Sequence, residues 1–317
     1  MSPQLTLQTP LQLPPSEIPT YLEQLWSHDE RGDKGANTFC LIVWQPAWIE
    51  QKLVKTGKIS GPVVGSQRND LIEAAREIIL KGDLPNSTSP LDFRVQSSIQ
   101  CDDSIKNVED LRGQHIDTSI SNLQPRRLIT IAPTIDKENN LETLVAAYCP
   151  LPEESGGKTA CGDVIVLRGN NTAINDGLKI VETLVPDELP SWLWWNGRID
   201  EAPEFLNALA LPNRRLIIDT ASGEPSVCLN LLLQRIQSGQ AVNDLNWLRL
   251  RGWRETLAMV FDPLQRRNAL DNLQKIDIDI EGSQTVQGLL LAAWTVSYTH
   301  LRAHETLRYL VCRLLLE

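Results

Sequence analysis

The stretch from residue 189 to residue 222 constrains the fold most, because it reads as strand, helix and strand in direct succession. Residues 192–195 (Trp-Leu-Trp-Trp) form a short apolar run that an Asn-Gly turn ends. Residues 201–211 carry apolar side chains at helical spacing, and a Pro-Asn pair closes them. Residues 214–219 run from two arginines through an apolar segment to Asp219, as parallel strands often do at their ligand-facing edge. The pattern predicts an α/β domain with an unusually aromatic strand.

Strands and helices alternate along the rest of the chain. Continuous apolar runs predict further strands at 38–45, 91–100, 127–133, 141–149, 164–168 and 275–280. Helical spacing predicts an N-terminal helix through Ile18 and Leu22, and helices over 69–81, 104–111, 172–184, 225–238, 244–262 and from 285 onward. Gly252 interrupts the helix over 244–262, so that helix is expected to begin as late as this residue. The fold class predicted is α/β: a mainly parallel sheet flanked by helices, followed by a truncated second α/β or α+β domain.

Composition limits the classes of function. Hydrophobic residues make up 42% of the 317, and no apolar run reaches the length of a membrane helix. The N-terminus lacks a secretory signal, and six scattered cysteines without a C-x-x-C pair fit a reducing compartment. The net charge of −10 disfavours nucleic acid as a partner. We therefore expect a cytoplasmic protein that binds neither nucleic acid nor a membrane.

Motifs for catalysis are weak or incomplete. SGGKT at 155–159 lacks the glycine that a phosphate-binding loop needs, because Pro152 holds that position, so a surface loop is expected. IIDTA at 217–221 is similar to half of an aspartic-protease site, but no second copy exists, and Asp219 is expected to cap a helix or pair with an arginine. No metal-ligand spacing or nucleophile motif occurs. The sequence therefore predicts no catalytic residue, metal or cofactor.

The tryptophans are the positive signal. Strand alternation must place at least one of Trp192, Trp194 and Trp195 on the face opposite the others. Core packing is the first expectation for them, and an indole left at the surface would suit a protein interface. Arg251 and Glu255 lie four residues apart, so a plain surface ion pair is the first expectation for them.

Several motifs in order resemble one known family. PSWLWWNGR at 190–198, RRLIIDTA at 214–221 and the segment Asp244–Asp262 are similar to OpcA, the glucose-6-phosphate dehydrogenase assembly protein family. The family typically shows an LWW strand, an arginine-led strand ending in Asp-Ser or Asp-Thr, and a W-x-R-x-x-x-W-R-E segment. AAYCP at 146–150 and CGDVIVLRG at 161–169 also fit. The similarity covers roughly residues 37 to 294, and the ordered set is specific where each motif alone is weak.

The resemblance implies a non-enzymatic accessory protein. Such a protein binds glucose-6-phosphate dehydrogenase, promotes its active oligomer and supports the oxidative pentose phosphate pathway. A family link to redox control in photosynthetic bacteria adds allosteric activation as a role and thioredoxin as a second candidate partner. The residues expected to form the partner-binding surface or its framework are Trp192, Trp194, Trp195, Asp219, Trp247, Arg249, Trp253 and Arg254.

Two other interpretations stay open at this point. An α/β enzyme or a sugar-phosphate-binding or nucleotide-binding domain would use the crevice at the carboxyl ends of the strands. Its distinguishing feature would be a pocket that gathers Asp219 with arginines such as Arg168 or Arg198. A purely structural remnant is the third interpretation.

The domain boundaries follow from these segments. Residues 1–36 are predicted to form an N-terminal helix and linker, 37–222 an OpcA N-terminal-like α/β domain, and 223–295 the start of a truncated OpcA C-terminal-like domain.

Residues 296–317 are expected to be a non-native tail. VSYTHLRAHET at 296–306 is similar to a translated sequencing-adapter end, and the residues after it read as its continuation. The alternative is a genuine amphipathic helix, because apolar residues recur at helical spacing over 307–314. The match over the whole string favours the first interpretation, so the natural protein is expected to continue past Trp294 with a different sequence.

Overall fold

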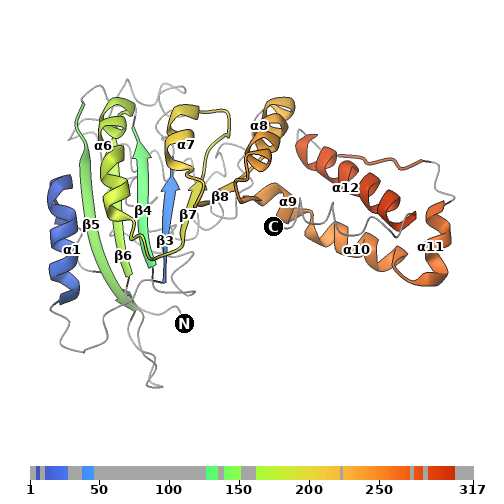
Figure 1. The fold of residues 1–317 in the computed structure, drawn as a ribbon, viewed down its shortest axis with the longest axis horizontal. Helices are drawn as coiled ribbons and strands as arrows, with labels where there is room; N and C mark the ends of the chain where they lie inside the picture. The colour runs from blue at the N-terminus through green and yellow to red at the C-terminus, as the bar shows by residue number, and fades with distance from the viewer. Residues whose placement is uncertain are drawn as a thin grey trace, which may run out of the picture. The chain divides into compact units, whose positions relative to one another are not determined.

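A mainly parallel β-sheet forms the centre of the first part of the chain (Figure 1). The computed structural model describes residues 5–7, 11–27, 38–45, 126–134, 139–150, 162–221, 224–271, 275–280 and 285–303. Contacts between residues divide the chain into two compact units, 1–196 and 197–317.

In the first unit, four parallel strands lie in the order β6-β4-β3-β7. They are β3 (Phe39–Trp44), β4 (Arg126–Pro133), β6 (Gly162–Gly169) and β7 (Ser191–Trp195). All six residues of β3 are buried, which explains why that strand reads as an unbroken apolar run. The antiparallel strand β5 (Glu142–Pro150) pairs with β6, and the short strands β1 (Leu5–Leu7) and β2 (Leu11–Gln12) pair with β5.

Two helices of this unit have clear sequence causes. Helix α1 (Ile18–Ser27) buries Ile18 and Leu22. Helix α6 (Asn171–Leu184) begins after Asn170, whose side chain accepts a hydrogen bond from the Ala173 N–H, and it lies along the sheet in Figure 1.

The second unit combines a two-stranded parallel pair with helices. Its elements are α7 (Pro203–Leu209), β8 (Arg215–Ile218), α8 (Pro225–Gln237), β9 (Val242–Asp244), α9 (Leu245–Arg249), α10 (Arg251–Phe261), α11 (Leu264–Asp271) and α12 (Thr285–Ala303). Strands β8 and β9 pair in parallel, with α8 between them in sequence. Pro225 opens α8 and Gly239 follows its end with a φ of +84°, a left-handed conformation that glycine adopts without strain.

The predicted α/β class with a mainly parallel sheet is confirmed. The strands predicted at 38–45, 127–133, 141–149, 164–168, 192–195 and 214–219 are β3, β4, β5, β6, β7 and β8. The helices predicted at 172–184 and 225–238 are α6 and α8. The helices predicted at 69–81 and 104–111, the strand at 91–100 and the loop at 155–159 lie outside the described residues. The domain boundaries and the non-native origin of 296–317 stay predictions.

Two predictions of elements need correction. The strand predicted at 275–280 is wrong: these residues form no strand, because no described segment pairs with them. The helix predicted over 244–262 is two helices, α9 and α10, which meet at Leu250. The Leu250 N–H donates to the Trp247 carbonyl three residues back, so the chain tightens at the junction, two residues before Gly252.

Candidate functional site

Trp195 belongs to the core of the sheet. Its indole is fully buried and stacks on Trp44 of β3, with ring centroids 4.7 Å apart and planes inclined by 4°. The two residues face each other in the register of β3 and β7. Trp195 is therefore a core residue, as core packing predicts for this strand.

The other two indoles of β7 lie on the opposite face of the strand, as alternation requires. Trp194 is half-buried and packs against a cluster formed by Phe39, Leu41 and Val43 of β3 with Leu128 of β4. Trp192 meets Phe39 at 5.4 Å between ring centroids and leaves 38% of its surface exposed. Trp192 is thus the one indole of β7 with substantial area open to solvent.

Asp219 and Arg249 form the best-defined ion pair among the predicted site residues. The Arg249 guanidinium donates from both terminal nitrogens to the two Asp219 carboxylate oxygens, at 2.8 and 2.5 Å. The Ala221 N–H also donates to Asp219, at 3.0 Å. The expectation that Asp219 pairs with an arginine is confirmed. The pair ties the end of β8 to α9, which is a structural role.

Sequence reasoning missed a buried polar cluster next to this pair. The Asp244 carboxylate accepts bonds from the Thr220 N–H at 3.1 Å, the Thr220 hydroxyl at 2.7 Å and the Asn246 N–H at 3.0 Å. Burial raises the pKa of Asp244, although these bonds and their charge-assisted character work to lower it. Asp244 caps α9 and holds the loop after β8. The signal in the sequence was Asp244 itself, since Asp is a preferred residue at the position directly before a helix.

Trp247 and Arg254 also come together. The Arg254 guanidinium carbon lies 3.7 Å from the centre of the Trp247 ring, and one terminal nitrogen donates to the Trp247 carbonyl at 3.2 Å. Burial is the main reason that the pKa of Arg254 lies below its ordinary value. A cation over an indole at this separation fixes α10 against α9. Arg251 and Glu255, by contrast, form the exposed i,i+4 pair that their spacing predicts, at 2.6 Å.

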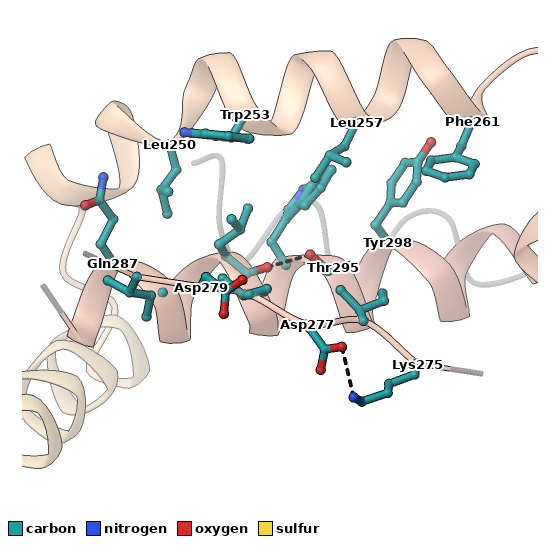
Figure 2. A pocket seen from close by; sticks show the side chains of 16 residues that line it. Leu250, Trp253, Leu257, Phe261, Lys275, Asp277, Asp279, Gln287, Thr295 and Tyr298 are labelled. Carbon is teal, nitrogen blue, oxygen red and sulfur yellow. Dashed lines mark hydrogen bonds and ion pairs between the residues drawn. The ribbon is translucent and has the colours of Figure 1, made fainter. Parts of the chain in front are cut away.

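Trp253 points into a groove of the second unit. Figure 2 shows Trp253, Leu257 and Phe261 projecting from α10 toward α12. With Leu250, Trp294 and the extended segment 275–280, these residues line a cavity of about 670 Å³, which we call the α10–α12 groove. Trp253 remains 63% exposed. Of the eight predicted residues, it is the most accessible indole, and an accessible indole in an apolar groove is the usual anchor of a protein interface.

Asp219 does not gather with Arg168 or Arg198 in the pocket that a sugar-phosphate site would require. Asp219 pairs with Arg249, whereas Arg168 pairs with Glu142 at 2.9 Å. Arg198 pairs with Asp200 at 2.6 Å. Each charge is therefore engaged with a neighbour of its own.

Among the residues that the structure describes, no cluster of three or more His, Cys, Asp or Glu side chains could hold a metal ion. None of the helices described combines the length and the apolar character needed to span a membrane.

Two family models, which describe the two domains of one subunit, match successive parts of the chain. A family model described as the glucose-6-phosphate dehydrogenase subunit N-terminal domain matches residues 117–234. A second model, described as the C-terminal domain of the same subunit, matches residues 240–308.

Curated relatives agree with the two domain models. Proteins named OxPP cycle protein OpcA from Synechocystis sp. (strain PCC 6803) and Nostoc punctiforme are 26% and 28% identical, over 93% and 92% of this chain. A third, from Synechococcus elongatus, is 27% identical over 93% of the chain. The matches cover 66%, 67% and 69% of these relatives, so the chain spans about two thirds of their length.

Proposed function

This chain belongs to the OpcA family of glucose-6-phosphate dehydrogenase assembly proteins, and on that premise we propose that it binds glucose-6-phosphate dehydrogenase and promotes its active oligomer. The observation that carries the proposal is the presence of both domains of the family, in order, on one chain. The oxidative pentose phosphate pathway is the process served, and the cytoplasm is the proposed location.

We further infer that the chain itself catalyses no reaction. The polar groups of the described residues support this inference, because Asp219 and Arg249 pair with each other, and Asp244 holds the loop after β8 through Thr220. The exposed indoles of Trp192 and Trp253 support a contact role instead. A protein of this kind activates an enzyme by binding its active assembly more tightly than its inactive forms, and the population shifts by that difference in affinity.

Redox control, with thioredoxin as a second partner, is a further part of the proposal. The described cysteines Cys40 and Cys228 are buried and form no disulfide with each other or with another described residue. Because a thiol must ionise and be accessible to exchange with thioredoxin, the exchange would fall on a cysteine other than these two.

The test is a titration of the cognate glucose-6-phosphate dehydrogenase with the full chain. We expect the sedimentation coefficient of the enzyme to rise and its substrate saturation curve to move to lower concentrations. An unrelated acidic protein of similar size serves as the control. Unchanged sedimentation and saturation at an excess of the chain would contradict the proposal.

A further inference from the structure

Residues 275–280 form an extended segment that has the pattern of a strand but no strand partner. The sequence Lys-Ile-Asp-Ile-Asp-Ile alternates strictly between polar and apolar residues. In the part of the chain that the structure describes, none of these six residues is assigned to a strand, and no hydrogen bond joins their backbone to another described backbone group. An extended segment with unpaired N–H and C=O groups is a template onto which another chain can add a strand.

The segment is already held in its extended form. Ile280 lies directly against the backbone of α12 at Gly288, where a built Cβ would come within 1.8 Å of the Ile280 Cδ1 atom. Only glycine leaves room for that side chain. A partner strand would therefore meet an edge that has already been ordered, which lowers the entropy that binding must overcome.

The α10–α12 groove beside this segment supplies apolar contact area. Trp253, Leu257 and Phe261 reach into it from α10 (Figure 2). Trp294 of α12 also lines it. Ile276 and Ile280 line the groove from the segment and remain 46% and 42% exposed. Tyr298, which falls in the residues predicted to be non-native, also lines the groove and lies by Phe261 in Figure 2. Apolar side chains that alternate along an added strand would enter this groove.

Charge decides between possible occupants. Asp277 and Asp279 are exposed, alternate with the isoleucines and also line the groove, and of the two only Asp277 has a described partner, Lys275 at 2.9 Å. A second copy of the chain is the weaker occupant, because it offers one cation, Lys275, against two aspartates. Antiparallel self-pairing centred on Ile278 sets Asp277 opposite Asp279, and pairing centred on Asp277 brings Lys275 opposite Asp279 but leaves Asp277 opposite itself. The net charge of −10 adds to this repulsion. The complementary occupant has Lys or Arg at the facing positions.

We propose that an extended segment of the dehydrogenase, with apolar residues alternating with Lys or Arg, adds as a β-strand along residues 275–280 and fills the α10–α12 groove. This inference rests on the proposed function for the identity of the partner. It goes beyond that function by assigning the surface, the backbone geometry and the charge of the segment that binds there.

A peptide experiment tests the surface without the dehydrogenase. The probes are a hexapeptide that alternates leucine with lysine, its leucine–glutamate counterpart, and the lysine peptide with alternate amides N-methylated. We expect calorimetry to detect the lysine peptide alone, with protection of alternate amides within 275–280 from hydrogen exchange. Binding of the N-methylated peptide with equal affinity would overturn strand addition, as would binding without amide protection or no binding of the lysine peptide.

A charge-reversed chain checks the polarity. Asp277→Lys combined with Asp279→Lys should weaken the lysine peptide by roughly tenfold and create affinity for the glutamate peptide. Binding of the glutamate peptide to this variant shows that the variant is folded. Asp176→Lys with Asp187→Lys, at exposed positions of the first unit, changes the net charge equally and should leave both affinities unchanged. Equal peptide preferences in all three chains would overturn the proposed charge match.

The dehydrogenase then separates this inference from the proposed function. Binding of the enzyme to the unsubstituted chain and the Asp176/Asp187 control, with loss in the Asp277/Asp279 variant, supports both. Equal binding to all three overturns the docking surface and leaves the proposed function standing. No binding to the unsubstituted chain counts against the proposed function, and with it against the dehydrogenase as the occupant of the groove.

Discussion

Cys228 is the residue whose environment most clearly limits its chemistry. It is fully buried in α8, and burial raises the pKa of its thiol to about 11, with the carboxylate of Asp200 adding to the shift. At pH 8 about one such thiol in a thousand is ionised, against about one in four for an unperturbed cysteine. Cys228 is therefore a packing residue.

This predicts a specific labelling pattern. Iodoacetamide at pH 8 should leave Cys228 unmodified in the folded chain, and peptide mass spectrometry should find it labelled only after unfolding in urea. Protection in the folded state follows from both burial and the low thiolate fraction. Rapid labelling of native Cys228 would show that α8 opens or that the thiol is more acidic than its surroundings imply.

Asp244 gives a second prediction at the scale of a single residue. Replacement by Ala removes the cap of α9 and the bonds to Thr220, so we expect a loss of about 2–3 kcal/mol in the free energy of unfolding. Urea denaturation measures this loss. Asp244→Asn keeps an acceptor for the two backbone N–H groups and should cost less. An Ala variant as stable as the unsubstituted chain would contradict the capping role.

The pH dependence of the Asn variant follows from the raised pKa of Asp244. Above the ordinary value of 3.8 and below its folded value, the folded chain keeps a proton on this carboxyl that the unfolded chain has lost. The contribution of Asp244 to stability is therefore complete below pH 3.8. It falls as the pH rises from 3.8 through the pKa of Asp244 in the folded chain. Relative to Asp244→Asn, the unsubstituted chain should lose stability from pH 4 upward. A relative gain over the same range would mean that the folded pKa is lowered.

At the scale of the element, the Asp219–Arg249 pair joins β8 to α9. Arg249→Ala leaves a carboxylate that is only 13% exposed without its main partner, so we expect a loss of about 2 kcal/mol. Double-mutant analysis with Asp219→Ala should show strong coupling, because the second change removes the stranded charge. Arg251→Ala is the matched control, since its ion pair is solvent-exposed and its loss should leave the denaturation midpoint unchanged. Equal effects at the two arginines would contradict the structural role.

Gly288 and Ile280 set the docking of segment 275–280 on α12. Gly288→Ala alone should destabilise the chain, because its Cβ displaces Ile280. In the background of Ile280→Ala the same change should stabilise it, by up to about 1 kcal/mol, because alanine favours a helix over glycine. Thermal unfolding of the four chains gives the sign in each background. The same sign in both would show that Ile280 does not lie against this backbone.

The two ion pairs of the second unit show what the sequence can and cannot predict about a site. Arg251 and Glu255 are four residues apart on one helix, so their pairing follows from local geometry. Arg249 and Asp219 are thirty residues apart, and only the parallel pairing of β8 with β9 brings α9 to the end of β8. The sequence predicts that Asp219 needs a cation, but it does not select which arginine.

Over the whole molecule, the predictable elements are those whose burial leaves a local pattern. Strand β3 is buried on both faces, so its apolar run identified it without knowledge of its neighbours. Strands β1, β2 and β9 are too short to carry a pattern, because they exist through pairing with distant strands. Segment 275–280 is the converse case: it has the alternation of a strand and lacks the partner. The local sequence sets the propensity of a segment to form a strand, but a strand forms only where the fold places a partner beside it.

The parallel indoles of Trp44 and Trp195 have a spectroscopic consequence. Rings at 4.7 Å and 4° couple their electronic transitions strongly, so the pair should contribute an exciton signal to the far-ultraviolet circular dichroism. That signal depends on the register of β3 against β7 and vanishes when the two strands separate. The two indoles are thus an intrinsic spectroscopic probe of the pairing of β3 with β7, and the probe requires neither an added dye nor a substitution.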